Sequence, residues 1–205
     1  MRLYFVRHGQ SEANRLHQFS NHGWKHPLTP LGHEQAADTA MRLSGCGVSY
    51  IYTSPLMRAV QTACVLAAQL RAPYEIDRRL IEFDCGEWEG SAAEQGWQAY
   101  DDLLTAWLVK GQHQQCLPGG ETLQQITTRL QAFLAACRAQ WPDPEITLAV
   151  VGHGGIYRCA LPLLCSNLQP TYGLQHPVPH LAVIELLPHG QQWVCRNWCG
   201  TPCQF

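Results

Sequence analysis

The chain has 205 residues, of which 46% are hydrophobic and 15% are charged, and its formal net charge is -2. This length and apolar content are enough for one domain over residues 1–205 and exclude a disordered chain. The near-neutral charge provides no basic face, so we expect no nucleic acid and no membrane as partners. Because no apolar run approaches the roughly 20 residues of a membrane-spanning helix and the N-terminus lacks a signal-peptide layout, we expect a cytoplasmic protein.

The first predicted element is a buried strand formed by the apolar run Leu3–Val6. It stops at the turn Arg7–Gly9, which places reactive side chains at the C-terminal end of the strand. The polar stretch Gln10–Asn14 after it is suited to a helix start or an ordered loop. Residues His17–His26 show no sustained periodicity, so we expect a surface loop there.

A helix follows this loop. Thr29 is suited to cap it, and Pro30 fits its first position. The helix continues to Leu43 with apolar residues spaced three and four apart on one face, and Ser44–Gly47 ends it.

A second strand and helix come next. Val48–Tyr52 is a short β-rich run, after which Ser54 is expected to cap a helix that has Pro55 at its first position. Arg58 falls in the first turn of this helix. It therefore emerges near the C-terminal end of a strand.

The middle of the chain is predicted to cover the site. Tyr74–Ile76 is a third short strand, and Glu82 follows in a loop rich in charge and glycine. From Ser91 to about Lys110, apolar residues at helical spacing form one stripe. We interpret residues 84–117 as a helical lid insertion that shapes a substrate cavity.

After the lid, the turn Leu117–Gly120 precedes a long helix that begins at Glu121 and ends before Pro142. At the C-terminus, Leu181–Leu187 and Trp193–Arg196 are typical of a closing hairpin.

The segment between the long helix and the hairpin repeats the arrangement of the N-terminus. The apolar run Leu148–Val151 leads into Gly152–Gly155, which contains His153, and a helix is expected from Ile156. If this strand and the first one are parallel neighbours, both histidines lie at the C-terminal edge of an α/β sheet, where such sheets bind ligands. We therefore predict the active site at this edge.

The side chains expected at this edge suit a compact dianion. Arg7, His8, Arg58 and His153 combine two arginines with two histidines, and guanidinium groups match phosphate oxygens two at a time. Phosphate is the expected ligand. Three glycines in these turns allow a close approach of the backbone, namely Gly9, Gly154 and Gly155.

The same residues suggest how a phosphoryl group could be transferred. No serine or cysteine lies in a recognisable nucleophile elbow, so His8 is the candidate nucleophile, with Ser11 a weaker one. Glu82 is the candidate general acid, provided that enclosure by the lid raises its pKa. The transferred group needs mainly charge stabilisation, which Arg7, Arg58 and His153 can supply without a metal.

Other chemistry-bearing residues receive plainer interpretations. The ten cysteines contain no CxxC pair and are expected to be free thiols, and only Cys195, Cys199 and Cys203 cluster, at a spacing that does not favour a metal site. Tryptophans of the lid region are expected to pack in the core or lid, and not to stack on bases. Four histidines are read as surface residues, His17, His22, His26 and His33, with His22 and His26 also candidate substrate contacts.

Several motifs together resemble the histidine phosphatase superfamily of phosphoglycerate mutase-like proteins. Arg7–Asn14, followed by Pro27–Thr29 and Gly32, resembles its opening signature. Further matches follow in family order, at Thr53–Ala63, Glu82–Gly90, Pro118–Thr122 and Gly152–Gly155. The resemblance covers roughly residues 2 to 165.

The resemblance implies a three-layer α/β/α sandwich with a mostly parallel central sheet and a helical lid, working through a phosphohistidine. It assigns the nucleophile to His8, the phosphate pocket to Arg7, Arg58 and His153, and the proton donor to Glu82. It adds Asn14 as a phosphate contact beside the backbone of Gly9 and Gly154. No metal or cofactor is implied.

Within the family, the residues favour a phosphatase of small phosphorylated metabolites. Phe83–Gly90 is similar to α-ribazole phosphatases and broad-specificity phosphatases, whereas the stretch after Glu82 lacks the longer insertion with paired arginines found in cofactor-dependent phosphoglycerate mutases. Such a mutase is the first alternative. A non-catalytic phosphate-binding module is the second, and a homodimer is an open option.

Overall fold

The computed structural model describes residues 1–204. Its strands are β1 (Arg2–Arg7), β2 (Val48–Thr53), β3 (Tyr74–Ile76), β4 (Thr147–Gly152), β5 (Val183–His189), β6 (Gln192–Trp198) and β7 (Thr201–Pro202). Its helices are α1 (Glu12–Arg15), α2 (Pro30–Leu43), α3 (Met57–Leu70), α4 (Glu94–Leu108), α5 (Leu123–Gln140), α6 (Gly154–Leu164) and α7 (Tyr172–Gln175), with short 3-10 turns η1 (Arg78–Leu80) and η2 (Gly86–Trp88).

All the strands named above belong to one mixed sheet, in the order β3-β2-β4-β1-β5-β6-β7. The first four in this order are parallel neighbours, but β1 pairs with β5, β5 with β6 and β6 with β7 in antiparallel fashion. The expectation of a mostly parallel sheet therefore holds for only half of the pairings. For the pairs β5–β6 and β6–β7 the reason is local, because the short turns that join these strands can connect only antiparallel neighbours.

The pairing of β1 with β4 aligns the two strand-histidine units. Arg2 lies opposite Thr147 and Arg7 opposite Gly152, without a shift in register. His8 and His153 therefore leave the sheet at the same edge, as the two apolar runs predicted.

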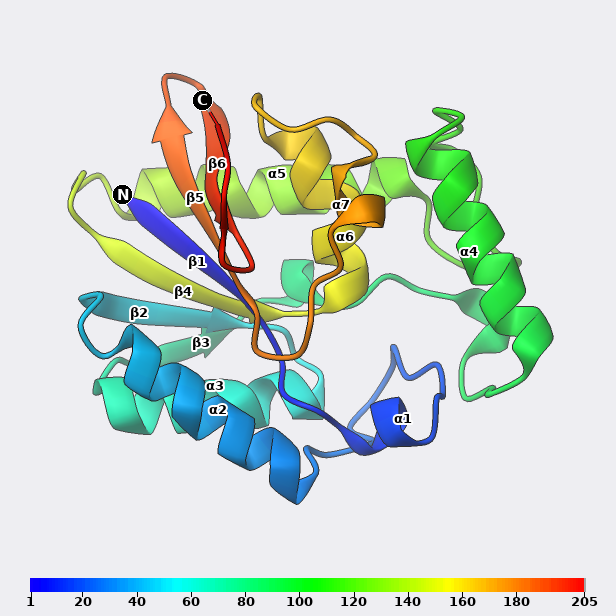
Figure 1. The fold of residues 1–205 in the computed structure, drawn as a ribbon, viewed down its shortest axis with the longest axis horizontal. Helices are drawn as coiled ribbons and strands as arrows, with labels where there is room; N and C mark the ends of the chain where they lie inside the picture. The colour runs from blue at the N-terminus through cyan, green and yellow to red at the C-terminus, as the bar shows by residue number, and fades with distance from the viewer. Residues whose placement is uncertain (205) are drawn as a thin grey trace.

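Helices cover both faces of the sheet (Figure 1). Because side chains alternate along a strand, Leu3 and Phe5 of β1 join the core that contains α5 and α6, while Tyr4 and Val6 join the core that contains α2 and α3. Each fully buried side chain of this size contributes about 1.5–3 kcal/mol. The central strands are thus held from both sides, which fixes the edge that carries the site.

Helix starts follow the sequence signals in part. Thr29 caps α2 as predicted, because its hydroxyl accepts from the Gly32 N–H at 3.1 Å. The expected cap at Ser54 is wrong, since α3 begins only at Met57. Ser54 Oγ instead accepts from the Leu56 N–H at 3.3 Å in a local turn, which suits a residue whose successor is proline.

Two other helices differ from prediction by two residues at their starts. The helix expected from Glu121 begins at Leu123, after a capping box in which Thr122 and Gln125 exchange hydrogen bonds. The helix expected from Ile156 begins at Gly154, directly after His153. The second shift matters for function, since it brings the amides at the start of α6 to the site.

Residues 84–117 contain η2 and the long helix α4, which stands apart from the sheet beyond the ends of the parallel strands (Figure 1). Trp107 of α4 is fully buried, and its indole N–H donates to the Gln115 carbonyl at 2.8 Å. The inner part of α4 is therefore anchored in the main core, as expected for packing tryptophans.

Two chemical features of the whole chain are relevant to function. All ten cysteines are free thiols. No helix within residues 1–204 is both long and apolar enough to cross a membrane.

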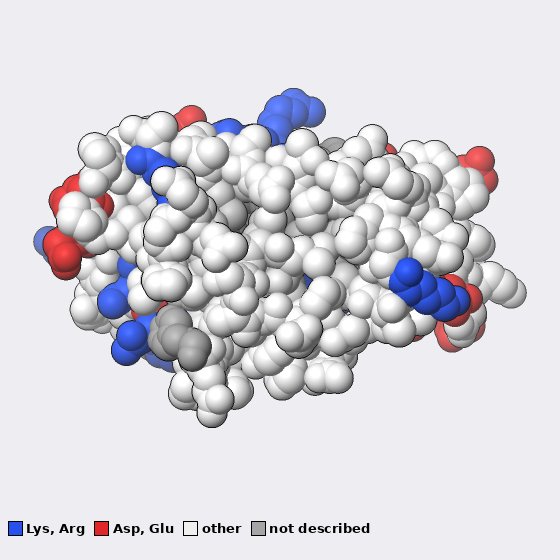
Figure 2. All heavy atoms as spheres, turned by 90° about the horizontal axis from the view of Figure 1, so that it is seen from above, with Lys and Arg blue, Asp and Glu red and all other residues white. Residues whose placement is uncertain are grey.

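The face shown in Figure 2 carries few charged side chains, and acidic and basic ones occur together toward its two ends.

Candidate active site

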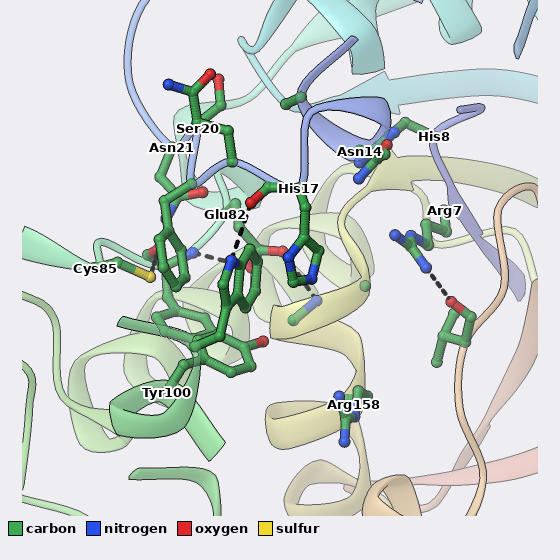
Figure 3. Close-up of a pocket in the computed structure, with 18 of the residues that line it drawn as sticks. Arg7, His8, Asn14, His17, Ser20, Asn21, Glu82, Cys85, Tyr100 and Arg158 are labelled. Atoms are coloured by element: carbon green, nitrogen blue, oxygen red, sulfur yellow. Dashed lines mark hydrogen bonds between the residues drawn. The ribbon is translucent and has the colours of Figure 1, made fainter. Parts of the chain in front are cut away.

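Three neighbouring parallel strands each deliver a functional side chain at the same edge of the sheet. His8 follows β1, Ser54 follows β2 and His153 follows β4. A cavity of about 460 Å³ opens beside them (Figure 3). Its lining includes Arg7, His8, Asn14, His17, Phe19, Arg58, Glu82, Glu94, Trp97, Tyr100, Asp101, Gly154, Gly155 and Arg158.

His8 is held in one tautomer by its two neighbours. Its Nδ1 lies 2.7 Å from the Gly9 carbonyl, and its Nε2 lies 3.1 Å from Nε of Arg58. Because the arginine can only donate and the carbonyl can only accept, the proton must be on Nδ1, and Nε2 carries the lone pair. Burial lowers the pKa of His8 well below its usual value, and the positive charge of Arg58 lowers it further. The imidazole is therefore neutral near pH 7 and carries its lone pair on Nε2.

His153 lies next to His8, with 5.1 Å between the ring centroids. Its Nε2 is 2.6 Å from Oγ of Ser54, while its Nδ1 is buried without a hydrogen-bond partner among residues 1–204. Burial lowers the pKa of His153 well below the usual value, and Arg58 again adds to the effect. An unsatisfied buried nitrogen beside the nucleophile is suited to a phosphate oxygen.

Arg58 connects the nucleophile to the loop that follows α1. Besides donating to His8, it donates through one terminal nitrogen to the Ser20 carbonyl at 2.8 Å. Burial lowers the pKa of Arg58 to about 10, and the negative charge of Glu82 limits this decrease. The guanidinium therefore remains charged at neutral pH. The prediction that Arg58 lies in the first turn of a helix near the sheet edge is confirmed.

Arg7 is positioned by the segment between α7 and β5. Its terminal nitrogens lie 2.6 Å from the Val178 carbonyl and 3.1 Å from Nε2 of His180. The remaining nitrogen, Nε, is buried and has no partner among residues 1–204. Burial lowers the pKa of Arg7. Its guanidinium packs against Gly154, where a Cβ would come within 2.9 Å of Nε, so this glycine is required for the arginine to lie there.

Glu82 lies against the N-terminus of α6. Its carboxylate accepts from the N–H groups of Phe83 at 3.0 Å, Gly155 at 2.9 Å and Ile156 at 2.9 Å. Burial raises the pKa of Glu82, and these three hydrogen bonds oppose the rise. A Cβ at position 155 would lie 2.7 Å from the Glu82 carboxylate, so Gly155 is needed for the carboxylate to lie against this backbone.

The other predicted contacts lie in different surroundings. Asn14 lines the cavity, and its side-chain oxygen accepts from the backbone and hydroxyl of Ser11 at 3.0 and 2.9 Å, which leaves the amide N–H groups to face a ligand. Gly9 is outside the cavity lining. Its N–H donates to Thr62 at 3.1 Å, and a Cβ there would meet the Gly32 carbonyl at 2.5 Å.

Of the loop histidines, His17 and His22 are exposed, as the surface reading predicted, and His26 is partly buried. His22 binds Asp84 at 3.0 Å, His26 lies 2.8 Å from the Ser20 hydroxyl, and neither lines the cavity beside His8. His17 does line it, although it showed no ligand spacing.

Sequence reasoning also missed Arg158 and Tyr100, which line the same cavity (Figure 3). The signal for Arg158 was available. It follows Gly154 by four residues, which places both on one side of a helix.

The assembled groups can bind a phosphate and share its charge. Arg58 donates to the lone pair of His8, Arg7 and the start of α6 line the same cavity, and the His153 ring lies 5.1 Å from the His8 ring between centroids. Glu82, a carboxyl group of raised pKa, also lines the cavity. Among residues 1–204, no group of three or more potential metal-ligating side chains is found. The two arginines and the lone pair of His8 together suit phosphoryl transfer to His8.

Comparison with known proteins agrees with this geometry. A family model for the histidine phosphatase superfamily (branch 1) matches residues 3–201. The chain is 32% identical over 163 residues to the "Putative phosphoserine phosphatase 2" of Hydrogenobacter thermophilus, which covers 80% of this chain and 78% of that protein. It is 31% identical over 205 residues to the "Probable phosphoglycerate mutase GpmB" of Salmonella paratyphi B, covering 97% and 90%. In structure it is similar to the α-ribazole phosphatase of Shigella flexneri, with a TM-score of 0.77, 24% identity and coverage of 100% and 99%.

Proposed function

The chain belongs to the histidine phosphatase superfamily, and we propose that it hydrolyses small phosphomonoesters through a phosphohistidine formed on Nε2 of His8. One observation carries this proposal. The Nδ1 proton of His8 is committed to the Gly9 carbonyl, so the lone pair on Nε2 is directed to the site where Arg58 donates.

In the first step, Nε2 of His8 attacks phosphorus while the bond from phosphorus to the ester oxygen breaks. The proton of Glu82 passes to the departing oxygen, so the leaving group is a neutral alcohol. A phosphate that enters the cavity takes over the N–H of Arg58 that now points at Nε2. In the second step, water attacks the phosphohistidine, Glu82 accepts its proton, and inorganic phosphate leaves with the nitrogen lone pair restored to His8.

Charge stabilisation comes from the protein's own groups in this proposal. Arg7, Arg58 and His153 neutralise the equatorial oxygens, and the free amide of Asn14 adds a further donor. We therefore propose a metal-independent, acid-type phosphatase without a cofactor, in which the backbone at Gly154 lies against the ligand. Gly9 acts through packing that holds the His8 turn.

We further propose that residues 84–117 act as the lid and that the helices and sheet form the family's three-layer sandwich, with helices on both faces in support. The α-ribazole phosphatase fold at 24% identity is compatible with an α-ribazole-like or broad-specificity enzyme. The cytoplasm is the proposed location.

The test is to trap the phosphoenzyme. Brief reaction with a ³²P-labelled phosphomonoester followed by an alkaline denaturing quench should leave label on the protein that is lost in acid. The His8→Ala variant should show neither label nor release of phosphate from an aryl phosphate, whereas His33→Ala, an exposed histidine on α2, should behave as wild type. Full turnover by His8→Ala would reject the mechanism, and a wild type that binds phosphate without any turnover would favour the binding module.

A phosphoglycerate mutase is the second candidate, because the match to the "Probable phosphoglycerate mutase GpmB" of Salmonella paratyphi B covers 97% of this chain. The two activities differ in where the phosphoryl group goes. Incubation with 3-phosphoglycerate and a bisphosphoglycerate primer should yield mainly free phosphate from a phosphatase and mainly 2-phosphoglycerate from a mutase. Isomerisation that outpaces phosphate release would replace the proposed activity.

A further inference from the structure

The segment that joins α7 to β5 holds Arg7 both at its backbone and at its side chain. The Leu181 N–H donates to the Arg7 carbonyl at 3.1 Å, and the Arg7 N–H donates to the Ala182 carbonyl at 3.1 Å. From the same segment, the Val178 carbonyl and Nε2 of His180 lie 2.6 and 3.1 Å from the two terminal nitrogens of Arg7. Both ends of this residue are therefore fixed by one short stretch of chain.

The backbone next to His180 is in an uncommon conformation. Leu181, which is buried, has a φ of 55°, in the left-handed region that residues other than glycine rarely adopt. Its carbonyl accepts from a terminal nitrogen of Arg42 at 3.3 Å. A strained backbone of this kind persists where its surroundings fix it. The conformation of Leu181 therefore gives His180 a fixed place beside Arg7.

Arg7 keeps donors for a ligand. A guanidinium has five N–H groups, and the bonds to Val178 and His180 use one on each terminal nitrogen. The Nε of Arg7 is buried without a partner among residues 1–204, and the side chain lines the cavity (Figure 3). The two bonds set the plane of the guanidinium. They thereby set the direction in which its remaining donors meet phosphate oxygens.

The acceptors that hold the two arginines of the phosphate pocket are neutral. Arg7 donates to a carbonyl and an imidazole, and so does Arg58. Neither forms an ion pair within residues 1–204. Two arginines outside the cavity pair with carboxylates instead: Arg79 with Asp77 at 2.5 Å, and Arg129 with Glu121 at 2.8 Å. A neutral acceptor orients a guanidinium without neutralising it, so the positive charge remains for a dianion.

His180 can accept from Arg7 only as a neutral imidazole. A guanidinium has no acceptor, so Nε2 of His180 must carry the lone pair and Nδ1 the proton. Burial lowers the pKa of His180 to about 4, and the positive charge of Arg7 adds to this decrease. The ring lies 6.0 Å from the His8 ring between centroids, yet His180 is not among the residues that line the cavity. Its effect on a bound phosphate must therefore pass through Arg7, to which it is hydrogen-bonded.

We propose that His180 is a positioning residue, whose neutral imidazole holds the Arg7 guanidinium in the orientation that binds phosphate and leaves the positive charge of Arg7 to the ligand. This inference rests on the proposed phosphatase activity and adds a residue outside the cavity to the same site. A carboxylate at position 180 would hold the guanidinium in the same way but would cancel its charge. Substitution can therefore separate the hydrogen bond from the charge.

Three substitutions of His180 test the hydrogen bond and the charge. The measurements are kcat/KM for p-nitrophenyl phosphate and, by calorimetry at pH 7, the Kd of inorganic phosphate. His180→Ala should lower kcat/KM and weaken phosphate binding about tenfold, the effect of losing one hydrogen bond to a charged group. His180→Gln, whose amide oxygen accepts from Arg7, should stay within about threefold of wild type. His180→Glu should fall at least about tenfold below His180→Gln, because its carboxylate neutralises Arg7.

A double-mutant cycle tests whether His180 acts through Arg7. In the Arg7→Gln background, His180→Ala should change kcat/KM by less than about twofold, because the guanidinium that it orients is already gone. His189→Ala is the matched control, since His189 is an exposed histidine at the end of β5, and it should keep wild-type values in both measurements.

Wild-type values in His180→Ala would overturn the positioning role, as would a tenfold loss that persists in the Arg7→Gln background or a His180→Gln variant as impaired as His180→Ala. Equal values in His180→Gln and His180→Glu would overturn the role of charge. If the wild type hydrolyses p-nitrophenyl phosphate in these cases, only the role of His180 fails. If the wild type binds inorganic phosphate but hydrolyses no ester, the proposed function itself fails, and the Kd values alone decide whether His180 positions Arg7.

Discussion

Burial shifts the pKa values of His8 and Glu82 in opposite directions, and both shifts serve the proposed reaction. It lowers the pKa of His8 and raises the pKa of Glu82, because a low-dielectric site disfavours the charged form of either group. A neutral imidazole and a protonated carboxyl are the states in which one can attack and the other can donate. A single physical cause thus shifts both pKa values in the direction that the proposed mechanism requires.

The role of Glu82 predicts a loss that depends on the leaving group. Glu82→Gln keeps the size of the side chain but removes its proton, so kcat for an alkyl phosphate should fall about 10²- to 10⁴-fold. With p-nitrophenyl phosphate the loss should be much smaller, since nitrophenolate leaves without a proton. Steady-state kinetics on both substrates measure the difference.

The pH profile of the same variant provides the control. In the wild type, kcat for the alkyl ester should fall as pH rises through the raised pKa of Glu82, and this limb should be absent in Glu82→Gln. Equal losses on both substrates, with the limb retained, would assign the proton to another group.

At the scale of single residues, the sequence was informative where a reactive side chain directly follows a strand or begins a helix. His8, Arg58 and His153 were located in this way, and the structure brings them together. The contact between His153 and Ser54 could not be derived, because it depends on how separate elements are set against each other, which residue spacing alone does not determine. Arg158 was missed although its spacing from Gly154 would have indicated it.

At the scale of elements, the site depends on close contacts between backbones. The turn after β1 packs on the start of α2, where a Cβ on Gly32 would lie 2.1 Å from the Gln10 carbonyl. The Thr29 N–H donates to that same carbonyl at 2.9 Å. This contact fixes the turn that carries His8, so α2 positions the nucleophile without contacting it.

Gly32→Ala should therefore destabilise the protein by about 1–3 kcal/mol, as expected when a methyl group is forced into a filled space. Urea unfolding at pH 7 measures the effect. Gly45→Ala is the matched control, because a Cβ at that position has no neighbour within 4 Å, and it should stay within about 0.5 kcal/mol of wild type. Equal effects of the two substitutions would show that the contact is not tight in solution.

Boundaries of elements were harder to predict than their existence. The start of α6 at Gly154 depends on Glu82 accepting the N–H groups of Gly155 and Ile156, a contact between residues more than seventy positions apart. A pattern of neighbouring residues cannot predict a contact with a residue so far away in the sequence. For the same reason Ser54 matched a helix cap in sequence while its hydroxyl lies beside His153.

At the scale of the molecule, the sheet divides into two parts. The parallel strands β2, β4 and β1 provide the catalytic edge, and apolar runs predicted them well because they are buried on both faces. The antiparallel strands β5, β6 and β7 extend the sheet, and the segment before β5 holds Arg7 through Val178 and His180. The hairpin was predictable, but its support of the phosphate pocket was not, since no motif marks it.

The concentration of buried histidines at this edge makes the stability of the whole molecule depend on pH. Burial lowers the pKa of His8 and His153 well below the usual value and that of His180 to about 4. Each of these histidines binds a proton near pH 6.5 in the unfolded chain but only at lower pH in the folded chain. Their contribution to the free energy of unfolding is therefore present above about pH 6.5 and is lost as pH falls. Glu82 has the opposite sign, because its raised pKa costs stability as pH rises through it.

With three histidines against one carboxyl group, we expect the thermal midpoint to fall by on the order of 5 °C between pH 7 and pH 5. Calorimetry at constant ionic strength measures it. His8→Asn should make the fall shallower, because one resisting group is removed, whereas His33→Ala, at an exposed position on α2, should leave the slope unchanged. A midpoint that stays level or rises toward pH 5 would mean that the folded chain takes up protons at least as readily as the unfolded chain in this range, and burial would then not be what keeps these imidazoles neutral.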